Sequence, residues 1–239
     1  MKKTPIVACI LNIETSTEVC SVAVSLDGKP LFERCNSEGP SHAVLLGPFV
    51  KEALDYLGSN NLKPDAVAVS CGPGSYTGLR IGVSMAKGLC FSLNLPLIAI
   101  ETTKVLARKA IEKGIADEGD LLCPMIDARR MEVYAALYDT SLQKVRNTQA
   151  DIVNDEIYAL YLATNRVFFF GNGAEKCHRV IENRNAVFVN EIVPLASSMT
   201  ALSEEAFRNE KFENTAYFEP FYLKEFIATQ AKNKVLTLQ

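Results

Sequence analysis

The sequence predicts an α/β protein built from two consecutive halves, and three observations support this. Apolar runs typical of strands open the first half at residues 6–13, 19–26 and 30–35. The Asp27-Gly28 pair between the last two runs is typical of a tight hairpin turn. The second half repeats the same order of elements, β-β-β-α-β-α-β-α. Three antiparallel strands followed by alternating helices and strands form a ribonuclease-H-like unit. Two such units in tandem are the plan of the actin-like (ASKHA) fold, which we therefore expect.

The rest of the first half alternates helices with strands. A helix is expected where apolar residues recur at helical spacing after Ser41, which is a suitable N-cap. Short apolar runs predict two parallel strands. The expected elements are a helix at 41–57, a strand at 66–70, a helix at 79–93, a strand at 97–100, and a helix capped by Thr102 or Thr103 that runs to about residue 113.

In the second half, strands are expected at 121–126, 132–138, 143–147, 167–170 and 186–189, with helices at 155–163, 174–182 and 197–209. The last helix is expected to pack across onto the first half, as the terminal helix of each half does in the actin plan. We therefore expect one subdomain at residues 1–102 plus about 195–215, a second at 103–194, and a C-terminal tail at 216–239.

The composition limits the function classes. The net charge of −3 argues against a free-standing nucleic-acid binder, because such proteins carry a basic field that follows the phosphates. The seven cysteines form no CxxC pair, which is typical of buried, reduced thiols in a cytoplasmic protein. No run of about 18 apolar residues occurs, so no membrane span is expected.

The turn between the first two strands of each half carries candidate ligand contacts. Enzymes with this fold place a glycine there, so that backbone N–H groups approach phosphate closely. Here the two turns read Ile-Glu-Thr-Ser-Thr from residue 13 and Ile-Asp-Ala-Arg-Arg from residue 126, without glycine. They are either ordinary polar hairpin turns or weak sites for a nucleotide or anion. In the second case the contacts would come from Glu14, Thr15, Ser16, Asp127 and Arg129.

The string Gly-Pro-Gly-Ser-Tyr-Thr-Gly-Leu-Arg at residues 72–80 follows a strand and opens a helix, where backbone N–H groups favour anions. It is not a Walker A loop, and Thr77 stands where a GxGxxG motif needs its third glycine. Two interpretations stay open: direct contact with a ligand, or a tight turn beneath closely packed helices.

Metal and hydrolase chemistry lack their usual residues. Leu46 stands four residues after His42, where a helical metal site would need a second histidine, and His178 has no neighbouring partner. Ser75 has no histidine nearby in the sequence, which argues against a serine hydrolase. We expect no catalytic residue, no metal and no cofactor.

Several strings resemble a known family. INIETST, SHAVLL, GPGSYTGLRIG, IDARRMEVYAA and EPFYLKEF match the TsaB (YeaZ) family in order and spacing over essentially the whole chain. Glu14 departs from the family's usual aspartate.

This resemblance implies an actin-like protein without a working catalytic site. It implies a partner subunit for a TsaD-like catalytic paralogue, which carries metal and nucleotide and transfers threonylcarbamoyl to the adenosine next to the anticodon of tRNAs reading A-starting codons. A TsaE-like ATPase would join the complex. This chain would contact tRNA only indirectly, through the complex as a whole. Two alternatives stay open: an actin-superfamily small-molecule kinase and a glycoprotease-type metallopeptidase. They would need phosphate-binding glycines and ligand-spaced histidines, respectively.

The helices expected at 41–57 and 79–93 are candidates for the partner surface. Their apolar residues extend past a single stripe, which predicts burial on two sides and self-association into a homodimer when the chain is alone. The alternative is that both helices lie within the chain's own core. Leu46→Arg or Gly82→Arg is expected to abolish partner binding without unfolding the chain. The expected contacts are Leu45, Leu46, Phe49, Val50, Ala53, Leu79, Gly82, Val83 and Ala86.

Overall fold

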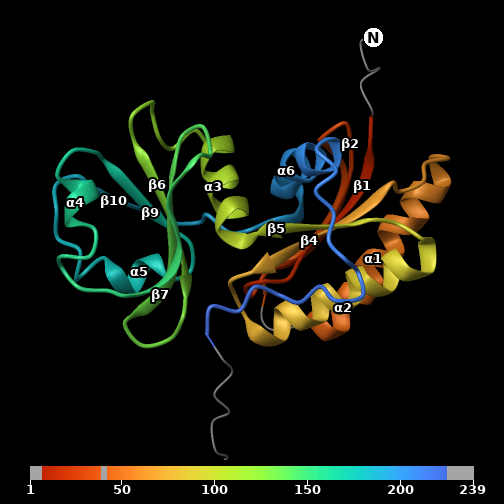
Figure 1. The fold of residues 1–239 in the computed structure, drawn as a ribbon, viewed down its shortest axis with the longest axis horizontal. Coiled ribbons are helices and arrows are strands. Elements are labelled where there is room, and N and C mark those ends of the chain that lie inside the picture. The colour runs from red at the N-terminus through yellow and green to blue at the C-terminus, as the bar shows by residue number, and fades with distance from the viewer. Residues whose placement is uncertain (1–6, 39–41, 225–239) are drawn as a thin grey trace, which may run out of the picture.

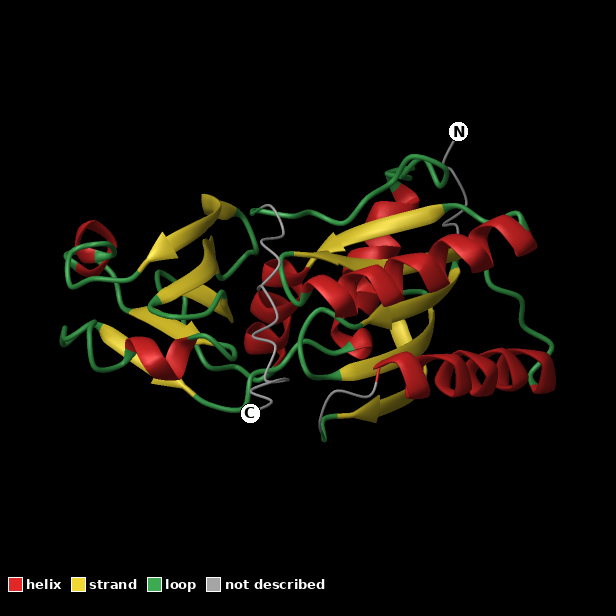
Figure 2. Ribbon diagram, turned by 90° about the horizontal axis from the view of Figure 1, so that it is seen from below, coloured by secondary structure: helices red, strands yellow, loops and turns green. Residues whose placement is uncertain are grey.

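The computed structural model describes residues 7–38 and 42–224, which form two lobes side by side (Figure 1 and Figure 2). Within these residues each lobe contains a five-stranded mixed sheet. The expected strand start at residue 6, the N-cap Ser41 and the tail beyond residue 224 lie outside the described residues.

The first lobe is built on a sheet with the strand order β3-β2-β1-β4-β5. Strands β1, β2 and β3 form an antiparallel meander, whereas β4 and β5 are added in parallel next to β1. The Asp27-Gly28 turn has left-handed backbone at both positions (φ 52° and 69°), as expected for a tight hairpin. The strands are β1 (Cys9–Glu14), β2 (Cys20–Leu26), β3 (Lys29–Asn36), β4 (Ala66–Gly72) and β5 (Leu97–Glu101).

Helices cover both faces of this sheet, which explains why β1 and β4 are buried along their whole length. The helices α1 (His42–Ser59) and α2 (Tyr76–Leu93) lie below the sheet in Figure 1. Helix α6 (Ala196–Arg208) lies above it, and α3 (Thr102–Glu112) connects the lobes.

The last helix returns to the first lobe, as expected for a terminal helix of this fold. Met199 and Leu202 of α6 pack into one cluster with Ile10 and Ile98 of the first sheet. Ser203 Oγ also donates a hydrogen bond of 2.7 Å to a side-chain oxygen of β1.

The second lobe repeats the plan with the strand order β10-β9-β6-β7-β8. Its meander runs β6-β7-β8, and β9 and β10 are added in parallel beside β6. The repeat confirms the actin-like α/β fold. Its elements are β6 (Leu121–Asp127), β7 (Glu132–Asp139), β8 (Lys144–Ile152), α4 (Ala159–Leu162), β9 (Val167–Phe170), α5 (Ala174–Cys177) and β10 (Ala186–Val189).

Two helices of the second lobe are shorter than expected. The helix predicted at 155–163 is only α4, because Asn154 Oδ1 accepts hydrogen bonds from the backbone N–H groups of Glu156 and Ile157 and holds them in a turn. The helix predicted at 174–182 ends at Cys177. The N–H groups of Val180 and Ile181 both bond to the Cys177 carbonyl, which continues the chain as tight turns.

The predicted caps also need correction. Helix α2 begins at Tyr76, three residues before the expected start, because Ser75 Oγ accepts a hydrogen bond from Gly78 N. Neither predicted threonine caps α3: Glu101 holds the N-cap position. The Thr103 hydroxyl instead lies 2.9 Å from the Tyr138 hydroxyl of the second lobe.

Candidate functional site

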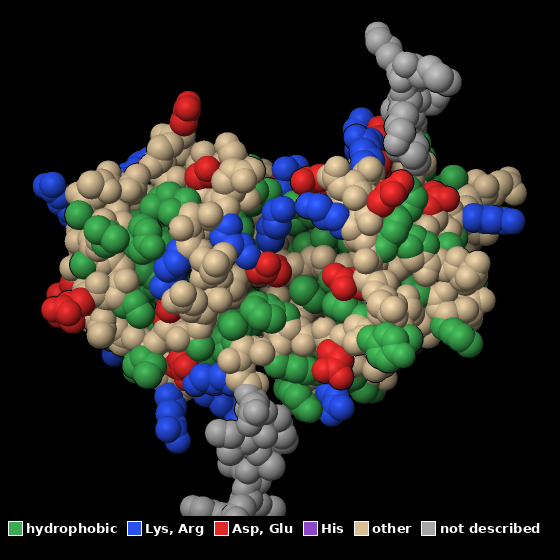
Figure 3. All heavy atoms as spheres, in the orientation of Figure 1, with side chains coloured by type: hydrophobic (Ala, Val, Ile, Leu, Met, Phe, Trp, Pro, Cys, Tyr) green, Lys and Arg blue, Asp and Glu red, His purple; other side chains and the backbone are tan. Residues whose placement is uncertain are grey.

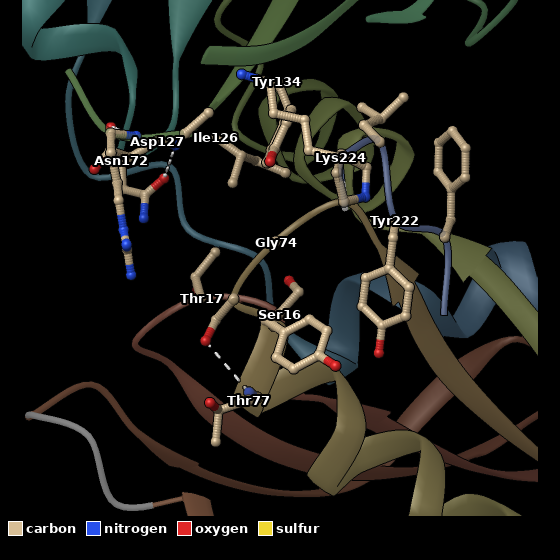
Figure 4. Close-up of a pocket in the computed structure, with 18 of the residues that line it drawn as sticks. Ser16, Thr17, Gly74, Thr77, Ile126, Asp127, Tyr134, Asn172, Tyr222 and Lys224 are labelled. Atoms are coloured by element: carbon tan, nitrogen blue, oxygen red, sulfur yellow. Dashed lines mark hydrogen bonds between the residues drawn. The ribbon is translucent and has the colours of Figure 1, made fainter. Parts of the chain in front are cut away.

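A cleft of about 590 Å³ lies between the lobes. In Figure 4, Asp127 and Asn172 of the second lobe face Ser16 of the first lobe across the cavity, and Tyr222 and Lys224 form a further side. The cleft therefore has three walls: the β1–β2 turn with the loop that opens α2, the β6–β7 turn, and the C-terminal segment.

The first hairpin turn is closed off by the chain itself. The side chains of Glu14, Thr15 and Ser16 are completely buried. Thr15 Oγ1 donates a hydrogen bond of 2.8 Å to the Gly78 carbonyl, and Ser75 N donates one of 2.7 Å to the Ser16 carbonyl. The turn is thus bonded to the start of α2, at the place where an enzyme of this fold would hold phosphate.

Three glycines make this packing possible. A Cβ added at Gly74, Gly78 or Gly82 would lie well inside 3.0 Å of an oxygen of Thr15 or Ser16. The residues are four apart, so on the opening loop and first turns of α2 they form one row against the hairpin turn. Of the two interpretations of this loop, close packing accounts for all three glycines.

Glu14 is an acidic residue in a completely buried position. Burial raises the pKa of its carboxyl group, and the hydrogen bond from the Ser16 backbone opposes that shift. Its Oε1 accepts a hydrogen bond of 2.6 Å from Ser16 N. This side chain therefore shapes the turn from inside the lobe and does not line the cleft.

The second hairpin turn is more open. The exposed Asp127 forms an ion pair with Lys176 and accepts a hydrogen bond of 3.1 Å from Arg129 N. Asn172 Nδ2 donates to Glu18 Oε2 across the cleft at 3.1 Å, which links the two lobes. Among the five predicted ligand contacts, Ser16, Asp127 and Arg129 line the cleft, and Glu14 and Thr15 do not.

Aromatic residues of the cleft were missed in the sequence. Tyr76 at the start of α2 packs against Tyr222 with ring centroids 5.1 Å apart, and Tyr134 lies on the second lobe. The aromatic string FEPFYLK was a usable signal, because a solvated tail rarely carries three aromatic residues within five positions.

A second candidate site is an apolar groove of about 660 Å³ on the outer side of α2, bordered by Ala43 of α1. Val44 of α1 and Phe91 of α2 are exposed by 73% and 89%, respectively. The groove is lined by Ala43, Arg80, Ile81, Ser84, Met85, Gly88, Leu89 and Ser92.

The predicted partner contacts lie on the side of these helices that faces the chain's own sheet. Leu45 and Phe49 are partly buried against the first core. The other seven are buried, because α1 and α2 turn their regular apolar stripe toward the sheet. The alternative interpretation, burial in the chain's own core, is therefore correct for Leu46, Val50, Ala53, Leu79, Gly82, Val83 and Ala86.

Within residues 7–38 and 42–224, no group of three or more His, Cys, Asp or Glu side chains is placed to hold a metal ion. The His42 ring bonds to the Val19 carbonyl (3.1 Å), and the His178 ring packs on Phe188. No helix in the same part of the chain is long and apolar enough to cross a membrane.

Comparison with known proteins places this geometry in a family. The family model described as "TsaD: tRNA N6-adenosine threonylcarbamoyltransferase" matches residues 39–232. The tRNA threonylcarbamoyladenosine biosynthesis protein TsaB of Escherichia coli K12 is 30% identical over 92% of this chain and 96% of its own length. The chain belongs to the TsaB family. TsaB of Bacillus subtilis 168 is 31% identical to this family member over 73% of the chain and 75% of its own length.

Solved structures agree with the assignment. YeaZ from Pseudomonas aeruginosa superimposes on this TsaB family member with a TM-score of 0.74 at 27% identity, and the match covers 90% of this chain and 100% of that one. The resemblance expected from the sequence motifs is thus confirmed.

Proposed function

We propose that this TsaB family member is a non-catalytic subunit of the machinery that makes threonylcarbamoyladenosine on tRNA, and that it acts by binding a TsaD-like catalytic paralogue. One observation supports the proposal that this chain is non-catalytic. The glycine row of α2 fills the first hairpin turn with the chain's own backbone, so a nucleotide phosphate has no place there. The described residues also offer no metal site to support a kinase or a metallopeptidase.

The outer groove of α2 supports the partner-binding part. Its partly exposed apolar residues are Ile81, Met85 and Leu89, and the small exposed residues Ser84 and Gly88 allow another helix to approach closely. An added Cβ at Gly88 would meet nothing within 4 Å, so this glycine is not required by the chain's own packing.

The occupant of this groove is the equivalent helix pair of the TsaD-like paralogue. The TsaD family model matches 39–232, which includes both helices, so the paralogue is expected to carry the same pair. Two helix pairs that pack face to face form a four-helix bundle. A second copy of this chain could use the same surface, which agrees with a homodimer in the absence of the paralogue.

The remaining parts of the proposal concern tRNA, the third subunit and location. Acidic and basic side chains are interspersed on the face drawn in Figure 3, and the net charge is −3. Such a surface favours contact with tRNA through the complex and not by this chain alone. A TsaE-like ATPase would join the complex. The seven free cysteines suit the reducing cytoplasm.

Reconstitution tests the proposal. The purified chain, the TsaD-like paralogue and the TsaE-like ATPase are mixed with the threonylcarbamoyl donor and tRNA, and modified adenosine is measured. We expect modification only when this chain is present, and negligible ATP hydrolysis by this chain alone. Full modification without it, or steady ATP turnover that Asp127→Asn abolishes, would contradict the proposal.

A further inference from the structure

The segment that follows α6 runs along α2 toward the gap between the lobes (Figure 1). It begins beside β5, where Glu213 N donates a hydrogen bond of 2.8 Å to the Leu97 carbonyl. It ends, among the described residues, at Lys224, which pairs with Glu132 of the second lobe. The segment therefore spans both lobes.

Its first part is held firmly on the first lobe. Lys87 of α2 donates hydrogen bonds to the carbonyls of Ala216 (3.1 Å) and Phe218 (3.0 Å). The Phe218 side chain packs against the first core. Phe221 N donates a hydrogen bond of 2.7 Å to the Cys71 carbonyl at the end of β4.

A glycine makes room for this path. Gly72 has φ 111°, which side chains rarely adopt, and a Cβ there would lie 2.7 Å from the Phe221 carbonyl oxygen. The first glycine of the 72–78 loop thus serves the C-terminal segment, whereas Gly74 and Gly78 serve the hairpin turn. The glycine at position 72 is therefore needed for the C-terminal segment to cross this loop.

The C-terminal end of the segment, after Phe221, is held by fewer and weaker contacts than its first part. Beyond Phe221 the segment lines the cleft, with Tyr222 packed on Tyr76. Within the described residues, the attachment to the second lobe is the ion pair of Lys224 with Glu132, whose side chains are 48% and 16% exposed, respectively. A partly exposed ion pair is weakened by solvent and screened by salt, whereas the anchors on the first lobe are backbone hydrogen bonds and apolar contacts.

We propose that residues 213–224 form a strap that closes one side of the interlobe cleft, with a hinge at Phe221 and a latch at Lys224–Glu132. Release of the latch would swing Tyr222 away from Tyr76 and open the cleft while both lobes stay folded. This goes beyond the proposed function, because it concerns the motion of this chain alone and requires no partner.

A single tryptophan at position 222 can report whether the strap is closed or open. The chain contains no tryptophan, so Tyr222→Trp places the only one at the closed side of the cleft. In this background we expect Lys224→Gln and Glu132→Gln each to raise acrylamide quenching by about twofold at low salt, and high salt to do the same to the parent, whose latch is intact. Lys211→Gln is the matched control, because it removes the same charge from an exposed residue that lies just before the strap.

Hydrogen–deuterium exchange provides a second measurement on the chain with its native Tyr222. Lys224→Gln should speed exchange in the peptide that covers 222–224, with the 72–80 loop less affected and the sheets unchanged. Equal quenching and equal exchange in Lys224→Gln and Lys211→Gln would overturn the latch. Full solvent quenching of the parent tryptophan, with rapid exchange in wild type, would overturn the strap itself.

Discussion

The hydroxyl of Thr15 donates a hydrogen bond to the Gly78 carbonyl, 2.8 Å away, and this contact joins the first hairpin turn to the first turn of α2. Because Gly82 lacks a side chain, the same hydroxyl fits against α2 one turn further along. The backbone of the first hairpin turn is therefore packed into the protein's own interior.

Gly78→Ala tests this packing. Its Cβ would overlap the Thr15 carbonyl oxygen, so we expect the free energy of unfolding to fall by about 1–3 kcal/mol, as for other overpacked sites. Urea unfolding followed by circular dichroism measures the change. Gly88→Ala is the control, since its Cβ meets nothing within 4 Å, and it should be neutral or stabilise by up to about 1 kcal/mol. Equal behaviour of the two variants would contradict the account.

Glu14→Gln tests the buried carboxyl group. Burial raises the pKa of Glu14 in the folded chain above its unfolded value, so the folded state binds the proton more tightly. The contribution of Glu14 to stability is therefore fully present below the unfolded pKa and decreases as pH rises through the folded pKa. Urea unfolding of both proteins from pH 4 to 7 should show Glu14→Gln gaining stability relative to wild type as pH rises. The exposed Glu118→Gln should show no such trend, and a constant difference for Glu14→Gln would refute the prediction.

Asp151→Asn tests a buried ion pair of the second lobe. Asp151 is 3% exposed, pairs with Arg146 and accepts a hydrogen bond of 2.6 Å from the Tyr158 hydroxyl. Removing its charge leaves the Arg146 guanidinium buried without a counter-charge, so we expect a loss of about 3–5 kcal/mol in unfolding experiments. Glu52→Gln, which breaks the exposed pair with Arg34, should cost only about 0–1 kcal/mol. Similar losses in the two variants would be inconsistent with this view of the lobe.

Ser84→Arg tests self-association through the outer groove. The exposed Ser84 lines the groove, so an arginine there places charge in a helix contact without entering the core. Analytical ultracentrifugation should show a concentration-dependent dimer for wild type and a monomer for Ser84→Arg. Ser141→Arg, at an exposed turn of the second lobe, should behave as wild type. A Ser84→Arg dimer of wild-type affinity would exclude the groove as the contact.

The order of strands was predictable, because short apolar runs and the Asp27-Gly28 turn are local signals. The role of the glycine loop was not, since glycine is required equally for a ligand and for the chain's own backbone to approach closely. The positions of Thr15 and Ser16 decide between these two roles of glycine. Those positions depend on contacts between residues about 60 apart in the sequence. The helix around α4 was predicted too long, because the Asn154 turn competes with helix formation at its start.

The partner residues were misplaced for a different reason. The composition of α1 and α2 shows that apolar residues extend beyond one stripe, but it does not say which stripe faces the sheet. The spacing of His42, Leu46, Val50, Ala53 and Leu57 was the available signal for the inner face. Accordingly, Leu46→Arg and Gly82→Arg are now expected to disrupt the fold: the first enters the core, and the second overlaps Thr15.

The most direct test of the central claim is the affinity of Gly88→Arg for the TsaD-like paralogue, measured by isothermal titration calorimetry after circular dichroism shows an unchanged fold. Gly88 lies in the outer groove and its side of α2 is open, so the arginine obstructs only an incoming partner. We predict a loss of affinity of at least about tenfold, equivalent to about 1.4 kcal/mol. Wild-type affinity in the folded variant, or no binding by the wild-type chain, would contradict the proposed partner surface.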